Sequence, residues 1–312
     1  MKRRIVLITV FTMLMLSACG SISGGSESND GAGLAGGDGG PRIIAHGDNL
    51  ITVPYEINSI AILGPSKAEI LVGLGFGDRI IATDRFAYDV VGLDESVVKE
   101  FGIMDPDAEY IVNLMPDIIF ISGPSVDNDG AFAPLINAGI TIIAMPTSTT
   151  VAGIMADIRF IASVMGDYEA GESIIATMQS EIDEITQIAA TISETRTVYF
   201  EVAPLFSLGS GTFLNELIEL AGAENVFSAQ EGWVAVVDEA VLEANPDVII
   251  TSTNFIDDPI GEIMERAGFD TIAAVQNEQV FQIDTSLSNR PTHNITRALR
   301  YIAEFVYPEY FR

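Results

Sequence analysis

Short β-branched runs alternate with amphipathic segments in two separate stretches of the chain, and this alternation constrains the fold more than any other feature. Residues 42–150 show the pattern, and residues 193–312 repeat it. Strands that alternate with helices are typical of parallel sheets whose faces are covered by helices. We therefore expect an α/β protein with two lobes, 42–150 and 193–312. A Gly-Asp-Asn turn at 47–49 also predicts a β-hairpin at the start of the first lobe.

Residues 151–192 lie between the two lobes and contain little turn chemistry. A helical period runs from Val151 to Met165 and again from Tyr168 to Ala190. About 23 residues at 1.5 Å each would form a rod of roughly 35 Å. An ordinary packed helix has the same period. The position between two α/β stretches instead predicts one long rigid helix that connects the lobes.

A sequence echo relates the two stretches at an offset of 130 residues. Glu109 lies seven residues before one Pro-Asp pair, and Glu239 lies seven residues before another. In both copies the glutamate opens a predicted helix and the Pro-Asp pair leads into a predicted strand, so we expect lobes of similar fold. One interpretation of the acids is local, because first-turn carboxylates oppose the helix dipole and Asp107 and Asp238 are candidate caps. The other is a pair of docking carboxylates.

Residues 1–18 have the pattern of an export signal. Basic residues at positions 2–4 precede an apolar run, Ile5–Leu16, that is too short to span a bilayer. The run ends at Leu16-Ser17-Ala18-Cys19, which resembles the lipobox of bacterial lipoproteins, in which the cysteine is lipidated and becomes the new N-terminus. Cys19 is the only cysteine of the chain. The alternative is an ordinary cleaved signal with an incidental cysteine.

Residues 19–41 contain the lipidation candidate Cys19 and a run of Gly, Ser, Asn and Asp. Such a segment cannot bury a core and is typical of a flexible tether. The acidic chain has no attraction for anionic lipid, so the predicted lipid is its only contact with the membrane. We expect an extracytoplasmic protein that is anchored by this lipid to the cell membrane.

Composition excludes several classes of function. The chain has 44 acidic and 15 basic residues, a net charge of −29, which argues against a nucleic-acid partner. One cysteine and two histidines, His46 and His293, exclude a cysteine-based zinc site and argue against any metal cage. Ser210 lies between glycines but outside a Gly-x-Ser-x-Gly elbow. We therefore expect no catalytic residue, no metal site, no resident cofactor and no enzymatic activity.

Together these features resemble the substrate-binding lipoproteins of ABC importers, in particular the class that binds iron–siderophore complexes, haem and cobalamin. The resemblance covers residues 42–312. It is carried by Ser59–Leu63 with Gly64-Pro65-Ser66-Lys67-Ala68-Glu69-Ile70-Leu71, by Leu74–Ile81, by the two Glu…Pro-Asp segments, by Gly211–Leu217 with Ala221–Phe227, and by Arg290-Pro291 through Tyr307-Pro308-Glu309. It implies a monomer with a ligand cleft between two α/β lobes.

The resemblance also implies a partner for the two equivalent glutamates. In this family a glutamate on each lobe engages basic groups of the importer's membrane subunits, and the matching residues are Glu109 and Glu239. Two carboxylates on a pseudo-twofold surface suit two arginines on a dimeric permease.

Loops that follow strand ends supply the ligand candidates, because ligands of open α/β sheets bind there. The predicted loops are 64–66, 84–89, 123–129, 204–210, 254–258 and 285–292. By resemblance, Phe206 and Trp233 occupy positions that face the cleft in cobalamin binders. Arg85 and Arg290 are notable among so few basic residues, and they suit either an anionic ligand or a salt bridge within the protein. The candidates are Ser66, Arg85, Phe86, Tyr88, Phe206, Trp233, Phe255 and Arg290; core packing is the alternative role of each aromatic.

Several ligands fit these candidates. The two arginines favour an anionic ferric chelate, and iron complexes are the commoner ligands of the family, so we expect a siderophore-like iron complex. The aromatics Phe206 and Trp233 favour cobalamin instead. Haem is a further alternative, with Tyr88 or His293 as an axial ligand. A function of another class, a surface sensor or adhesin without transport, shares the predicted lipid anchor but does not need the paired glutamates.

Overall fold

The computed structural model describes residues 40–46, 49–122 and 129–311. The predicted export signal, Cys19 and nearly all of the predicted tether therefore lie outside the described residues. Within the described part of the chain, no helix is both long enough and apolar enough to cross a membrane.

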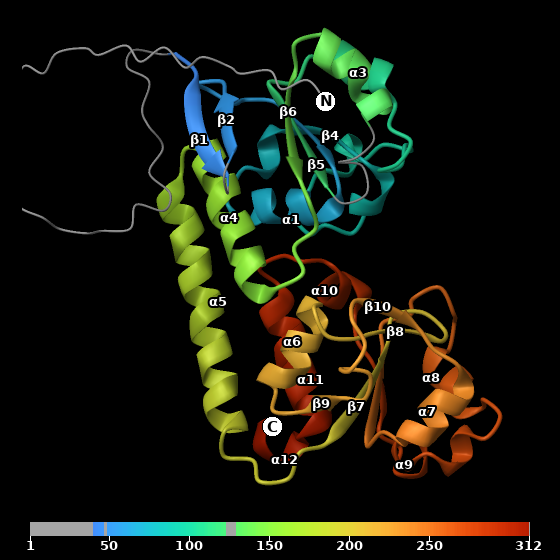
Figure 1. Cartoon of the computed structure of the whole chain (residues 1–312). Coiled ribbons are helices and arrows are strands. Elements are labelled where there is room, and N and C mark those ends of the chain that lie inside the picture. Colours follow the sequence, from blue (N-terminus) through green and yellow to red (C-terminus); the bar gives the residue numbers. More distant parts are fainter. Residues whose placement is uncertain (1–39, 47–48, 123–128, 312) are drawn as a thin grey trace, which may run out of the picture. The chain divides into compact units, whose positions relative to one another are not determined.

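A four-stranded parallel sheet forms the core of the first lobe, called the N-lobe here (Figure 1). Its strand order is β4-β3-β5-β6, and the central strands β3 and β5 are buried along their whole length. Continuous apolar runs are expected where helices cover both faces of a parallel sheet. The elements are β3 (Ile60–Leu63), α1 (Pro65–Gly73), β4 (Ile80–Thr83), α2 (Ala108–Leu114), β5 (Ile118–Ser122), α3 (Asp129–Asn137) and β6 (Thr141–Met145), with 3₁₀ turns at Gly77–Arg79, Arg85–Ala87 and Glu95–Val97.

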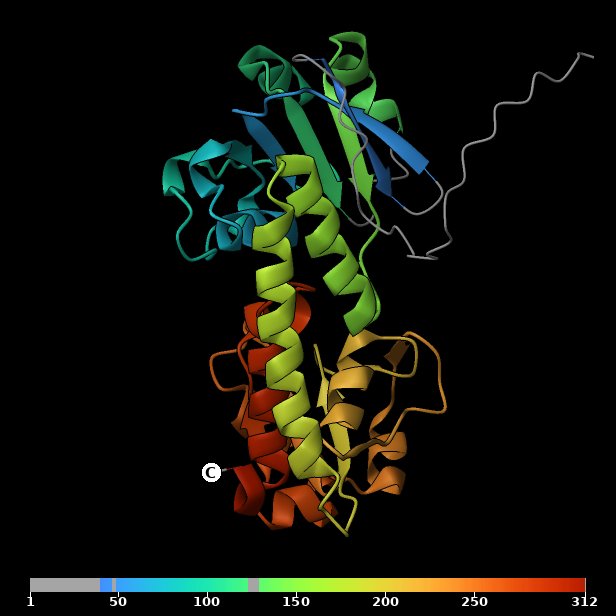
Figure 2. The same cartoon turned by 90° about the vertical axis from the view of Figure 1, so that its left-hand side faces the viewer.

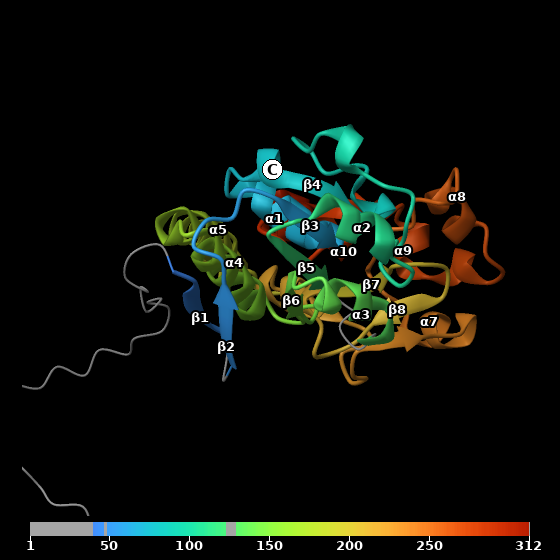
Figure 3. The same ribbon diagram turned by 90° about the horizontal axis from the view of Figure 1, so that it is seen from above.

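An antiparallel hairpin precedes this sheet. Strand β1 (Arg42–His46) pairs with β2 (Asn49–Val53), which confirms the hairpin that the turn at 47–49 predicts. Strand β1 packs against α4 (Val151–Met165), and the view from above shows the hairpin beside that helix (Figure 3).

The second lobe, the C-lobe, has its own parallel sheet of order β12-β11-β7-β9. The two α/β lobes with parallel sheets are therefore confirmed. The elements are β7 (Thr197–Glu201), β8 (Phe206–Leu208), α6 (Phe213–Leu220), β9 (Glu224–Asn225), β10 (Trp233–Ala235), α7 (Asp238–Ala244), β11 (Val248–Thr251), α8 (Pro259–Met264), α9 (Ala273–Gln276), β12 (Val280–Gln282), α10 (Thr285–Asn289), α11 (Ile295–Val306) and α12 (Pro308–Phe311), with a 3₁₀ turn at Phe269–Thr271.

Helix α5 (Tyr168–Ala189) follows α4 and is 22 residues long. It packs against α4 and also against α6 and α11 of the C-lobe, so its length runs beside both lobes (Figure 2). At Gly171 a side chain would bring its Cβ within 2.6 Å of the Ala162 Cβ, so glycine lets α4 and α5 approach closely. The rigidity of this connection stays a prediction.

The sequence echo has an exact structural counterpart. Helix α2 begins at Ala108 and α7 begins at Asp238, the positions that the offset of 130 residues relates. Both helices end at a left-handed residue, Met115 with φ 48° and Asn245 with φ 44°, and a proline follows each. A helix stops at such a residue, and the proline cannot continue it.

The aspartate of each Pro-Asp pair ties two neighbouring strands together. Asp117 Oδ2 accepts hydrogen bonds from the backbone N–H of Ser59 at 2.9 Å and from its hydroxyl at 3.0 Å. Asp247 Oδ2 accepts the same pair of bonds from Thr197, at 2.8 and 2.9 Å. The repeated motif therefore has a structural role, because it sets the register at which adjacent parallel strands begin.

Candidate ligand cleft and docking surface

A cavity of about 380 Å³ lies between the lobes, and residues from both lobes line it. Apart from Ile103, its lining residues come from segments that follow strands β3, β4, β11 and β12, the place where open α/β sheets bind ligands. The N-lobe contributes Pro65, Phe86, Tyr88, Asp89 and Ile103, and the C-lobe contributes Asn254, Thr285, Ser286, Asn289 and Arg290. Of the predicted ligand residues, the structure brings Phe86, Tyr88 and Arg290 together in this wall.

A second cavity of about 400 Å³ shares residues of this wall, among them Tyr88, Asn254 and Ser286. We call the two cavities together the inter-lobe cleft. Tyr88 is 65% exposed and Phe255, next to Asn254, is 69% exposed, so both rings are open to solvent. The cleft therefore offers aromatic surface beside amide and hydroxyl groups, a combination that suits a large and partly apolar ligand.

Phe206 and Trp233 form a stacked pair on a small antiparallel sheet of the C-lobe. Strands β8 and β10 carry them, with Ala235 opposite Phe206 and Trp233 opposite Leu208. The ring centroids are 6.4 Å apart and the planes differ by 16°. Both rings are exposed, by 40% and 49%, so core packing is not their role. Large exposed aromatic surface of this kind is typical of binding sites.

A buried carboxylate supports the turn that leads to Phe206. Leu205 has a φ of 56°, and its N–H donates to Glu201 Oε2 at 3.2 Å. The two Glu201 oxygens also accept from both Nη atoms of Arg266, at 2.6 and 2.8 Å, and from the hydroxyl of Tyr199. Burial would lower the pKa of Arg266, but its hydrogen bonds to Glu201 and Glu262 raise it overall. Burial, together with the charge of Glu201, raises the pKa of Tyr199.

The pattern of residues did not point to Glu201. Its role depends on Arg266, which lies 65 residues away in the sequence, and a lone acid at a strand end has many alternatives. The one available signal was its place at the end of a buried strand, where an unpaired charge is costly.

Arg85 is exposed and turns back onto its own lobe. Its Cζ lies 5.2 Å from the centroid of the Phe86 ring, and its Nη1 donates to the backbone oxygen of Glu100 at 3.3 Å. A cation over an aromatic face is held loosely at an exposed site. The protein itself therefore engages the Arg85 guanidinium.

Arg290 forms salt bridges within the protein, which the sequence left open as the alternative to a ligand contact. Its Nη2 forms an ion pair with Asp89 Oδ1 and donates to the backbone oxygen of Phe86 at 2.9 Å. Its Nη1 lies 3.6 Å from Glu69 Oε2. Burial would raise the pKa of Asp89, but hydrogen bonds from Ser286 and Arg290 lower it overall.

Asp84 holds together two loops of the N-lobe that border the cleft. It is buried, and it accepts hydrogen bonds from the backbone N–H of Gly64 at 2.7 Å and of Phe86 at 2.9 Å. Burial raises the pKa of its carboxyl. Gly64 has a φ of 129°, and a Cβ there would lie 2.4 Å from the Ser122 side chain. The adjacent Ser66 is buried in the first turn of α1.

His293 does not share a cavity with Tyr88 in the described residues. It lines a neighbouring cavity of about 520 Å³, which shares Asp89, Ser286 and Arg290 with the inter-lobe cleft, and its ring packs against Gly73. Within the described part of the structure its Nδ1 has no hydrogen-bond partner. Burial lowers the pKa of His293, and the charge of Glu69 opposes this.

This burial predicts a pH dependence of stability. In the unfolded chain His293 takes up a proton near the ordinary histidine pKa of 6.5, whereas burial disfavours its protonation in the folded protein. The free energy of unfolding is therefore highest above pH 6.5 and decreases as the pH falls below that value. The variant His293→Gln should lose less stability than the unsubstituted protein between about pH 7 and pH 5. Urea unfolding at the two pH values measures the difference. An equal loss in both proteins would contradict the prediction.

Glu109 and Glu239 occupy the same exposed position, the second residue of α2 and of α7. Within the described residues neither carboxylate forms an ion pair. Asp107 caps α2 by accepting from the N–H of Tyr110 at 2.9 Å. The corresponding prediction for Asp238 is wrong, because α7 begins at Asp238 itself and Val237 takes the N-cap position without a side-chain bond.

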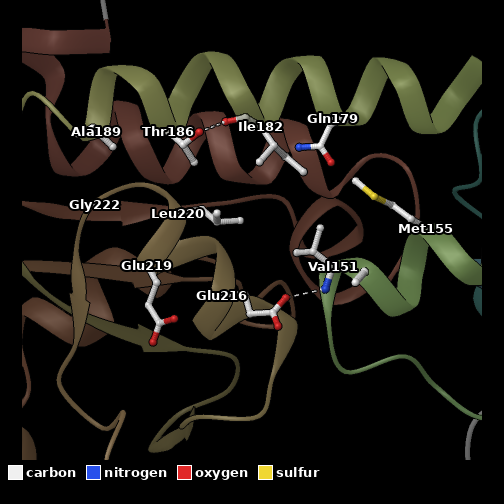
Figure 4. A pocket seen from close by; sticks show the side chains of 12 residues that line it. Val151, Met155, Gln179, Ile182, Thr186, Ala189, Glu216, Glu219, Leu220 and Gly222 are labelled. Carbon is white, nitrogen blue, oxygen red and sulfur yellow. Dashed lines mark hydrogen bonds between the residues drawn. The ribbon is translucent and has the colours of Figure 1, made fainter.

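A further cavity, of about 640 Å³, lies between α4, α5 and α6 (Figure 4). Mostly apolar side chains line it, including Met155, Ile182 and Leu220. At its edge, the carboxylate of Glu216 accepts from the N–H of Val151 at 2.6 Å, which ties α6 to the start of α4. The described residues that line it are all different from those of the inter-lobe cleft.

Comparisons with known proteins agree with this two-lobed arrangement. The model of the family described as periplasmic binding protein matches residues 60–287. A Bacillus subtilis protein named as an uncharacterized ABC transporter substrate-binding lipoprotein, YvrC, is 28% identical over 84% of this chain and 84% of its own length. The vitamin B12-binding protein of Vibrio cholerae is 27% identical over 83% of this chain and 92% of its own.

Among solved structures, one of a possible iron-binding, periplasmic solute-binding protein from Staphylococcus epidermidis superposes with a TM-score of 0.69. It is 24% identical, and the match covers 81% of this chain and 99% of that chain. This likeness shows the fold.

Proposed function

Since this chain belongs to the periplasmic binding protein family, whose relatives include ABC transporter substrate-binding proteins, we propose that it captures a large metal chelate outside the cytoplasm and delivers it to an ABC importer. The observation that carries the proposal is the inter-lobe cleft at the carboxyl ends of the strands, with exposed aromatic rings beside it. Such a surface suits a large planar or partly apolar ligand.

A corrinoid is the ligand that the geometry supports best. The stacked rings of Phe206 and Trp233 offer a flat apolar face, and the V. cholerae relative is named for vitamin B12. Arg290 no longer favours an anionic ligand, because Asp89 and Glu69 already pair with it. The exposed Arg85 donates to a neutral backbone oxygen and keeps its charge available to a ligand. A neutral or weakly charged chelate avoids placing negative charge in an acidic protein.

A siderophore-like ferric complex is the second candidate. The likeness to a structure named as a possible iron-binding protein shows the fold alone, but the amide and hydroxyl groups of Asn254, Thr285 and Asn289 suit the oxygen-rich surface of such a chelate. Haem is the third. Tyr88 is open to the cleft and remains an axial-ligand candidate, whereas His293 lines the neighbouring cavity that shares Asp89, Ser286 and Arg290 with the cleft.

A ligand panel tests the proposal. Cyanocobalamin, haemin and several ferric siderophores are added to the purified protein while thermal unfolding is followed. A ligand at a hundred times its Kd adds about 2.7 kcal/mol of stability. Trp233 is the only tryptophan, so its fluorescence reports binding directly, because all three chelates absorb light. If no member of the panel shifts unfolding or quenches fluorescence, the chelate assignment is wrong.

A substitution tests the aromatic pair. Phe206→Ala should raise the Kd for the bound chelate by about tenfold, because a lost stacking contact of this size is worth about 1.4 kcal/mol. Calorimetric titration measures the Kd. Tyr301→Ala is the matched control, since Tyr301 is similarly exposed, at 39%, but lies on α11. Equal affinities of both variants would contradict the assignment.

We further propose that Cys19 carries a lipid anchor and that the protein has no catalytic role. A Cys19→Ser variant should move from the membrane fraction to the soluble extracytoplasmic fraction, which tests the anchor without disturbing the cleft.

A further inference from the structure

We propose that a polar latch between the lobes sets the width of the ligand cleft before any ligand arrives. The latch consists of Asp89 and Glu69 of the N-lobe and of the C-lobe segment 286–294. This inference rests on the proposed function for its consequence, the affinity of the cleft, but its geometry can be tested without a ligand. It assigns Arg290 a positioning role in place of a direct ligand contact.

Asp89 is the first anchor of the latch. It lies in the N-lobe after β4, and each of its carboxylate oxygens accepts from the C-lobe: Oδ1 from Arg290 and Oδ2 from the hydroxyl of Ser286. The side chains of Arg290 and Asp89 are only 12% and 27% exposed. A charge pair that is largely shielded from water is stronger and more precise in geometry than a surface pair.

Glu69 is the second anchor, on helix α1. It accepts from the hydroxyl of Thr292 at 3.0 Å and from the side-chain amide of Asn294, and it lies 3.6 Å from Arg290 Nη1. Every one of these donors belongs to the C-lobe segment 286–294. Figure 1 shows α10, where this segment begins, directly beneath α1.

The latch and the cleft share their residues. Ser286, Arg290 and Asp89 line the cavity of about 380 Å³, and Arg290 also donates to the backbone oxygen of Phe86, whose ring borders the same cavity. A movement that widened the cleft would have to break these bonds. Only molecules whose cleft has the correct width bind the chelate well. Loss of the latch leaves a smaller fraction of molecules with that width, and the apparent affinity falls in proportion to this fraction.

Two single substitutions and their combination separate this role from direct ligand contact. Arg290→Gln and Asp89→Asn should each raise the Kd for the chelate that the panel identifies by about tenfold, and the double variant should lose no more than either single one. If Arg290 instead bound the ligand, Asp89→Asn would leave the affinity unchanged or improve it. That result would overturn the proposal.

Small-angle scattering of the ligand-free protein supplies a readout that no ligand assignment affects. Both single variants should show a larger radius of gyration than the unsubstituted protein. The control pair is Arg300 with Glu184, an exposed ion pair of 2.8 Å, whose variants Arg300→Gln and Glu184→Gln should leave the radius and the Kd unchanged. An unchanged radius in both latch variants would refute the latch, even if the chelate assignment held.

If Arg290→Gln fails to fold, a milder substitution still tests the latch. Ser286→Ala removes only the bond to Asp89 Oδ2 and should raise the radius and the Kd in the same direction as Asp89→Asn. If no chelate in the panel binds, the proposed function fails while the scattering result still decides whether the latch exists.

Discussion

Replacing Glu109 and Glu239 together with alanine should abolish uptake of the ligand while leaving its Kd unchanged. The reason is the position of the two acids. Each is the exposed second residue of its helix, α2 or α7, and within the described residues neither is held in an ion pair. Two carboxylates at equivalent positions can meet two basic groups on a dimeric permease, whereas capping alone would not require both.

Uptake of labelled ligand in cells, together with calorimetry on the purified variant, measures the two outcomes. Each single substitution should weaken uptake, because one charge contact across an interface is lost and the other remains. The control replaces Glu95 and Glu169, exposed glutamates outside α2 and α7, and it should transport normally. Normal uptake by the Glu109→Ala/Glu239→Ala variant would contradict the docking role of the two glutamates. A surface sensor or adhesin without transport would then be the favoured class of function.

Arg266→Ala should destabilise the C-lobe by about 3–5 kcal/mol, because it leaves the carboxylate of Glu201 buried without its charged partner. The side chains of Arg266 and Glu201 are 9% and 1% exposed. The matched control is Arg159→Ala. It breaks the pair of Arg159 with Glu172, whose side chains are 34% and 37% exposed, and an exposed pair contributes only about 0.2–1 kcal/mol.

Urea unfolding followed through Trp233 measures this difference in the lobe that carries the network. The same substitution should also weaken chelate binding, because Glu201 accepts from the N–H of Leu205 in the turn that leads to Phe206. If the Arg266→Ala and Arg159→Ala variants unfolded at the same urea concentration, the buried network would contribute no more to stability than an exposed ion pair.

Local patterns predicted the two lobes and their relation. The alternation of strands and helices in residues 42–150 and 193–312 corresponds to two parallel sheets. The echo around Glu109 and Glu239 corresponds to helices whose first residues are 130 positions apart. Both features were predictable because short-range periodicity and turn chemistry decide them.

Two short elements were not predicted. Residues 204–210 and 285–292 were expected to be loops, but the first contains strand β8 and the second contains helix α10. Strand β8 has three residues and pairs only with β10, and α10 has five residues. Elements this short carry almost no period of their own, and their partners elsewhere in the chain stabilise them.

The sequence by itself therefore determined the class of fold, the paired glutamates and the set of aromatic candidates, because neighbouring residues encode period and motif. Only the tertiary structure decided what Arg290 faces. Asp89 is 201 residues away from it in the chain, and nothing local to either residue marks them as partners. Pairing across two lobes depends on how closely folded surfaces approach, so a scarce arginine could equally suit a ligand or the protein until the lobes were in place.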